Sequence, residues 1–105
     1  MKLKGKVVVI TGASAGVGRA TAQAFAKQGA TIALIARGID GLQAAKKEVE
    51  DLGGQALTVP LDVSDHQALE GAVTRIEQTL GAIDIWVNNA MLSVFSPVKE
   101  MRPEE

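Results

Sequence analysis

Three glycines, Gly12, Gly16 and Gly18, are spaced closely enough to surround an anion with backbone amide groups. They follow an apolar run, Val7-Val8-Val9-Ile10, that is typical of a strand buried on both faces, and a helical pattern begins directly after them. Without side chains, backbone N–H groups can approach a ligand closely, and the start of a helix adds a partial positive charge suited to phosphate. The stretch 7–18 therefore predicts a phosphate-binding turn between a strand and a helix.

The glycine spacing, G-x-x-x-G-x-G, differs from two common nucleotide-binding motifs. It is not the G-x-G-x-x-G dinucleotide fingerprint. A P-loop would require Gly-Lys-Ser/Thr at positions 17–19, where this chain has Val17, Gly18 and Arg19. Hydrolysis of nucleoside triphosphates is thus disfavoured, and a purely structural glycine turn remains the alternative.

Arg37 follows a second apolar run, 31–36, and stands 19 residues after Gly18. A dinucleotide-binding fold places the group that meets the adenosine ribose at this point. An acid there would accept from the 2′-hydroxyl, whereas a guanidinium offers a fork of donors and a fixed positive charge that suit a 2′-phosphate. Arg37 therefore favours NADP over NAD, although Asp40 is nearby and an ordinary surface arginine is the alternative.

Asp62 ends a third run, 56–61, at the edge where open α/β sheets bind ligands. A turn or helix-cap role is its structural alternative. His66 is interpreted as a surface histidine, since one histidine cannot build a zinc site and no cysteine is present. We expect no metal site.

The elements that must position these residues alternate along the chain. Strands are expected at 7–10, 31–36, 56–61 and 83–87, and helices at 17–28, about 42–52 and about 64–80. The first helix is expected to turn one stripe toward the sheet: Val17, Ala20, Thr21, Ala24 and Phe25. Ser64 is the expected N-cap of the third helix, and Lys46, Lys47, Glu48 and Glu50 are expected to form a solvated face. Right-handed βαβ units then give a parallel sheet.

Length and charge narrow the function classes. A chain of 105 residues is one domain at most, and its net charge of −1 without a basic stripe argues against nucleic-acid or membrane partners. No apolar run approaches 18 residues and no signal-peptide core follows the N-terminal lysines, so a soluble, cytoplasmic protein is expected. A receiver-like signalling domain would need acidic residues where Thr11-Gly12 stands.

Three motifs together resemble the short-chain dehydrogenase/reductase family. T-G-A-S-A-G-V-G at 11–18 resembles the family's cofactor loop, Asp62-Val63 its Asp-Val pair, and Asn88-Asn89-Ala90 its N-N-A-G motif, with Met91 in place of the glycine. The resemblance implies a Rossmann-like α/β fold with strand order 3-2-1-4. It also implies NAD(P)-dependent oxidation of alcohols or reduction of carbonyls.

The same resemblance implies a set of cofactor-binding residues. In it, Asp62 would accept from the adenine amine and the asparagine segment would lie against the nicotinamide half, although asparagines at a strand end can instead lock neighbouring strands. The set is Gly12, Ser14, Ala15, Gly16, Val17, Gly18, Arg37, Asp62, Val63, Asn89 and Ala90.

The family's reaction also needs a Tyr-x-x-x-Lys pair with a serine and a further asparagine, and the chain contains no tyrosine. We therefore expect residues 1–105 to be a partial dinucleotide-binding domain, truncated after its fourth strand, that binds NADP(H) without catalytic residues of its own. A small-molecule alcohol or carbonyl substrate is expected only for a full-length form. The alternative is a free-standing nucleotide-binding or protein-interaction module. An open apolar edge at Ile83, Ile85 and Val87 predicts self-association.

Overall fold

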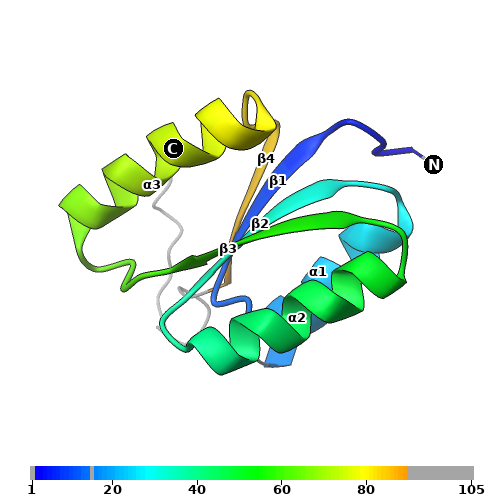
Figure 1. Cartoon of the computed structure of the whole chain (residues 1–105), viewed down its shortest axis with the longest axis horizontal. Helices are drawn as coiled ribbons and strands as arrows, with labels where there is room; N and C mark the ends of the chain where they lie inside the picture. The colour runs from blue at the N-terminus through cyan, green and yellow to red at the C-terminus, as the bar shows by residue number, and fades with distance from the viewer. Residues whose placement is uncertain (1, 15, 90–105) are drawn as a thin grey trace, which may run out of the picture.

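The computed structural model describes residues 2–14 and 16–89. Within them, strands and helices alternate in the order β1 (Val7–Thr11), α1 (Gly16–Lys27), β2 (Thr31–Ala36), α2 (Ile39–Asp51), β3 (Gln55–Pro60), α3 (His66–Leu80) and β4 (Ile85–Asn88). The four strands form one parallel sheet in the order β3-β2-β1-β4 (Figure 1). The predicted Rossmann-like architecture is confirmed.

The two central strands carry the most apolar sequences of the chain. Every residue of β1 is buried, and so is every residue of β2 after Thr31. The two strands pair in register from Val7 opposite Thr31 to Thr11 opposite Ile35. Unbroken runs of β-branched and small apolar residues suit strands covered on both faces, because neither face meets water.

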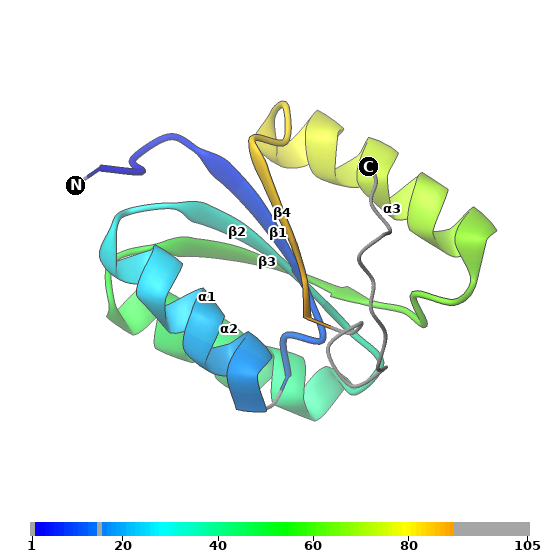
Figure 2. The same ribbon diagram turned by 180° about the vertical axis from the view of Figure 1, so that it is seen from behind.

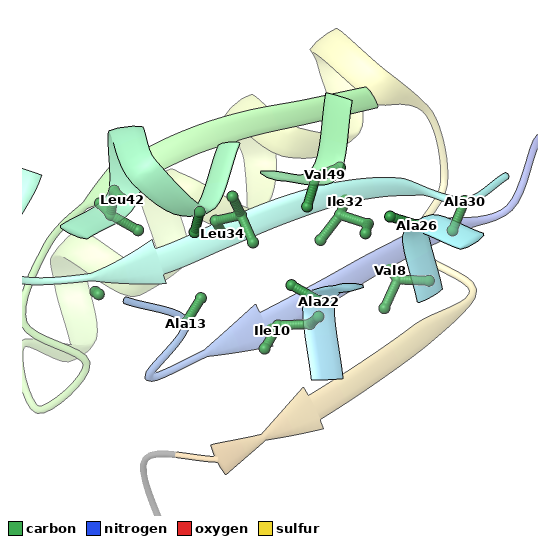
Figure 3. Close-up of a cluster of buried hydrophobic side chains, with 12 residues drawn as sticks. Val8, Ile10, Ala13, Ala22, Ala26, Ala30, Ile32, Leu34, Leu42 and Val49 are labelled. Carbon is green, nitrogen blue, oxygen red and sulfur yellow. The ribbon is translucent and has the colours of Figure 1, made fainter. Parts of the chain in front are cut away.

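Helices α1 and α2 cover one face of the sheet, and α3 covers the other (Figures 1 and 2). On the first face, side chains from β1 and β2 pack against alanines of α1 and larger residues of α2 (Figure 3). The fully or almost fully buried members shown are Val8, Ile10, Ile32, Leu34, Ala22, Ala26, Leu42 and Val49. On the second face, Ala72 and Ile76 of α3 pack against Val9, Ala33, Ile35 and Val59.

The stripe expected on α1 was wrong except for Phe25, which is partly buried against the cluster on the α1 and α2 face. The buried positions are Gly18, Ala22 and Ala26, whereas Val17 is 63% exposed. These three residues are four apart, so they form one row along the helix. Because these residues are small, α1 packs close to the sheet. The stability gained from this close packing exceeds what would be gained by burying the larger Val17 instead.

Two local expectations also need correction. Asp65, not Ser64, caps α3, and its carboxylate accepts from the Ala68 N–H at 3.1 Å. The third strand begins and ends one residue earlier than predicted, at Gln55–Pro60, and the fourth begins two residues later and runs to Asn88.

Strand β4 lies at the edge of the described sheet and pairs with β1 only. The side chains of Ile85 and Val87 are half-buried against the cluster beneath α1 and α2, and Ile83 packs toward the α3 side. Trp86 is instead the large apolar side chain exposed along β4, at 39%. The expected open edge is therefore present in the backbone pairing, but its three isoleucine and valine side chains point largely inward.

Candidate functional site

The carboxyl ends of β1, β2 and β3 meet at one edge of the sheet and surround a pocket of about 550 Å³. Ligands of open α/β sheets bind at this edge, because the loops that leave the strands diverge there. The lining residues come from the end of β2 and from the loops after the three strands: Gly12, Ser14, Ala36, Arg37, Gly38, Leu61, Asp62 and Val63.

Two glycines shape the loop after β1 for different reasons. Gly16 has a φ of +57°, in the left-handed region that glycine adopts without strain. A Cβ at Gly18 would lie 1.9 Å from the Gly12 carbonyl oxygen, so only a bare backbone lets α1 begin against the loop. The Ala13 N–H donates to the Ile35 carbonyl at 3.2 Å and ties this loop to β2.

Arg37 extends from the end of β2 toward the end of β3. Its side chain is 78% exposed, and its Nη1 lies 3.6 Å from Oδ2 of Asp62. An ion pair this long and exposed contributes little to stability. The guanidinium can therefore turn toward a ligand at small cost.

The two carboxylate oxygens of Asp62 have different partners. Oδ1 accepts from the Ser64 backbone N–H at 2.9 Å and from the Ser64 hydroxyl at 2.8 Å. These hydrogen bonds, followed by the charge of Arg37, lower the pKa of the Asp62 carboxyl from its usual range. Asp62 is thus ionised at neutral pH, and Oδ2 is the oxygen directed toward Arg37 and the pocket.

Asn88 ends β4 and Asn89 follows it, and their side chains have different surroundings. Oδ1 of Asn88 accepts from the Thr11 hydroxyl at 2.7 Å and joins the ends of β4 and β1. The side-chain nitrogen Nδ2 of Asn89 is buried and has no hydrogen-bond partner among the described residues. The strand-locking role therefore belongs to Asn88.

Five of the predicted site residues line the pocket: Gly12, Ser14, Arg37, Asp62 and Val63. Gly16, Val17, Gly18 and Asn89 do not, although Gly18 supports the loop from beneath. Ala15, Ala90 and Met91 lie outside the described residues. Sequence reasoning missed Ala36, Gly38 and Leu61 as lining residues. Each is adjacent to a predicted residue, so the strand-end rule applied to neighbours would have found them.

A second polar group, outside the pocket, joins α1 to α2. Arg19 donates through Nε and Nη2 to the two carboxylate oxygens of Glu48, at 2.7 and 2.6 Å, and Gln23 adds a hydrogen bond at 2.9 Å. The hydrogen bonds from Arg19 and Gln23 lower the pKa of Glu48 to about 2. The expectation that Glu48 belongs to a solvated face was therefore wrong, because it has a bidentate partner on the neighbouring helix.

The fold and this strand-end pocket are typical of α/β proteins of Rossmann type. A family profile described as short chain dehydrogenase matches residues 6–105. The chain belongs to the short-chain dehydrogenase/reductase family and corresponds to the N-terminal, cofactor-binding part of its members.

The relatives that match this chain are much longer than it is. It is 38% identical to a short chain dehydrogenase of Pseudocercospora fijiensis over 104 residues, which are 99% of this chain and 33% of that protein. It is 36% identical to a 3-oxoacyl-(acyl-carrier-protein) reductase of Thermotoga maritima over 105 residues, which are 100% of this chain and 43% of that protein. The chain therefore spans about a third to two fifths of these relatives.

Solved structures of the family show the same arrangement with both kinds of cofactor. L-sorbose reductase from Gluconobacter frateurii, complexed with NADPH and L-sorbose, matches with a TM-score of 0.81 and 39% identity, over 99% of this chain and 40% of that one. An NAD⁺-bound xylitol dehydrogenase matches with a TM-score of 0.79 and 34% identity, over 82% and 33%. In residues 2–14 and 16–89, no helix has the length and apolar character needed to cross a bilayer.

Proposed function

We propose that residues 1–105 are the NADP(H)-binding portion of a short-chain dehydrogenase/reductase domain. The complete enzyme would transfer hydride between the cofactor and an alcohol or carbonyl substrate. The observation that carries this proposal is the pocket that brings Gly12 and Ser14 of the glycine loop together with Arg37 and Asp62. When bound, the cofactor would supply the hydride chemistry.

The pocket's donors and acceptors fit the adenosine half of a dinucleotide. Backbone amides of the loop at the start of α1 suit phosphate. Arg37, exposed and positively charged, suits a 2′-phosphate on the ribose. Asp62 accepts from the adenine amine through Oδ2 in this proposal, because Oδ1 already accepts two hydrogen bonds from Ser64. Val63 would lie beside the base, while Gly16, Val17 and Gly18 would present backbone at the pyrophosphate.

Affinity measurements on the unmodified chain, a pocket variant and a control variant test the preference for NADP over NAD. Isothermal titration with NADPH and NADH would compare the unmodified chain with Arg37→Ala and with Arg75→Ala. Arg75 is an exposed arginine of α3, distant from the pocket and without an ion-pair partner among the described residues. Loss of the charge-assisted contact at Arg37 should weaken NADPH binding roughly tenfold and leave NADH nearly unchanged. Tighter binding of NADH than NADPH by the unmodified chain would refute the NADP assignment.

Hydride transfer also needs a proton donor and acceptor at the substrate oxygen. In the family this is the tyrosine that the present sequence does not contain. We therefore propose that these 105 residues alone bind cofactor without turnover. The purified chain should not oxidise NADPH with a panel of aldehydes and ketones, and measurable oxidation above a protein-free blank would contradict this.

We also propose that the isolated chain associates through the β4 side of the sheet. There, a strand that pairs only with β1 among residues 2–14 and 16–89 carries the half-exposed Trp86. Light scattering coupled to size exclusion should show a mass that rises with concentration, and Trp86→Lys should reduce it. A monodisperse, cooperatively melting monomer would count against association and favour the module alternative.

A further inference from the structure

The first turn of α2 touches the glycine loop at a position without a side chain. A Cβ at Gly41 would lie 2.8 Å from the Ser14 Cβ and 3.1 Å from the Ser14 carbonyl oxygen, whereas ordinary contact begins at 3.4 Å. Gly41 lies within α2 and has no positive φ. Space, not backbone conformation, is therefore what glycine contributes at this position.

Helix α2 is held firmly, so the loop would be the part that moves if a side chain were added. Leu42, Ala45 and Val49 are buried against the sheet, and Glu48 receives the two-pronged hydrogen bond from Arg19. The hydrogen bond from the Ala13 N–H to the Ile35 carbonyl, at 3.2 Å, holds the loop one residue before Ser14, so Ser14 would shift about this fixed point. A methyl group at position 41 would thus displace Ser14 by about 0.6 Å or more from α2.

This displacement would alter the pocket. Ser14, Arg37 and Gly38 all line it. Gly38 is also the residue before α2, and its carbonyl accepts from the Leu42 N–H at 3.1 Å. The contact between Gly41 and Ser14 therefore governs how close Ser14 lies to the start of α2, next to Gly38 and Arg37.

We propose that Gly41 is a specificity-determining residue, because its bare backbone lets Ser14 and Arg37 act on the same ligand group. This rests on the proposed binding of NADP(H). A 2′-phosphate that is bound by the Ser14 hydroxyl and the Arg37 guanidinium together must reach both, whereas a 2′-hydroxyl forms fewer bonds and depends less on their spacing. Widening the pocket therefore reduces NADPH affinity more than NADH affinity.

The test compares Gly41→Ala with Gly71→Ala in the full chain. Gly71 lies on the exposed side of α3, where an added Cβ meets nothing within 4 Å. Isothermal titration should show NADPH affinity reduced roughly tenfold in G41A and NADH affinity reduced by no more than about twofold, with G71A changing neither. Equal losses for both cofactors, or no loss, would overturn the proposal.

A double-mutant cycle separates failure of this proposal from failure of the proposed function. Ser14→Gly removes the Cβ that a methyl at position 41 would meet. Alanine also stabilises a helix, so the informative quantity is the change in melting temperature caused by G41A, which should be more favourable in the S14G background than in the unmodified chain. Independent effects of the two changes would show that Gly41 does not seat Ser14, and would overturn the proposal whatever the cofactor results. If the changes are coupled but the unmodified chain binds neither dinucleotide, the proposed function is refuted, and the specificity role with it.

Discussion

Substituting three glycines one at a time tests whether the loop after β1 depends on space or on backbone conformation. Gly18 meets the Gly12 carbonyl, Gly16 has a positive φ with open space around it, and Gly71 of α3 has open space and no positive φ. Alanine at each position adds the same methyl group. The three variants therefore separate a steric clash, a backbone strain and the intrinsic helix preference of alanine.

The expected changes in the free energy of unfolding follow from the surroundings of each glycine. At Gly18 the methyl must move away from a backbone oxygen 1.9 Å distant, and that oxygen cannot rotate aside as the end of a side chain would. Overpacking at its upper range costs about 3 kcal/mol, and helix preference returns about 1 kcal/mol, so the free energy of unfolding should fall by about 2 kcal/mol. Gly16→Ala should cost about 1–2 kcal/mol through left-handed strain, and Gly71→Ala should gain about 0.5–1 kcal/mol.

Urea unfolding measures these differences, followed by far-ultraviolet circular dichroism and by fluorescence of Trp86, the single tryptophan. Unchanged slopes with denaturant would show that the midpoints report stability. If Gly18→Ala is as stable as Gly71→Ala, α1 does not begin against the Gly12 carbonyl, and the argument for close packing of the loop is refuted.

Two further predictions concern the supporting structure. Glu48 has a folded-state pKa of about 2 against an ordinary 4.5, so its stabilising effect is complete above pH 4.5 and is lost as the pH falls toward 2. Glu48→Gln should therefore lose less stability than the unmodified chain between pH 5 and pH 2, whereas Glu50→Gln, an exposed neighbour, should follow the unmodified chain, as acid titrations of unfolding would show. Ile76 of α3 is fully buried, so Ile76→Ala should lower the free energy of unfolding by about 2–5 kcal/mol, as measured by urea unfolding. Val17→Ala, at a 63% exposed position, should change it by less than about 0.5 kcal/mol, and similar losses in both variants would contradict the assigned packing of α3.

The strands could be predicted because their composition is unambiguous. The runs 7–10 and 32–36 are apolar throughout and are followed by glycine-containing turns, so burial on both faces could be predicted before their partners were known. The buried face of α1 could not be predicted in the same way. Hydrophobicity alone points to Val17 and Phe25, of which only Phe25 packs against the core. The fully buried positions are Gly18, Ala22 and Ala26, whose small size matters only once a sheet lies against them.

Long-range polar contacts show the other limit of sequence reasoning. The rule that ligands bind at strand ends located Arg37 and Asp62 correctly at one pocket. It could not indicate that Ser64 would occupy one oxygen of Asp62, nor that Arg19 would reach Glu48, 29 residues away. Such contacts depend on the relative placement of loops and helices, which hydrophobic periodicity does not encode.

The two carboxylate oxygens of Asp62 have different partners, and this places a negative and a positive group side by side at the pocket. Ser64 fixes the carboxylate through Oδ1, so Oδ2 keeps one direction and the negative charge persists at neutral pH. Arg37 then lies between this fixed charge and solvent, 3.6 Å from Oδ2 and largely exposed. A ligand that brings both a hydrogen-bond donor for Oδ2 and an anion for the guanidinium satisfies both charged groups, whereas an anion alone would meet the carboxylate's repulsion. If the proposed function holds, we therefore expect the pocket to bind a nucleotide with a base amine and a phosphate more tightly than a simple phosphate ion.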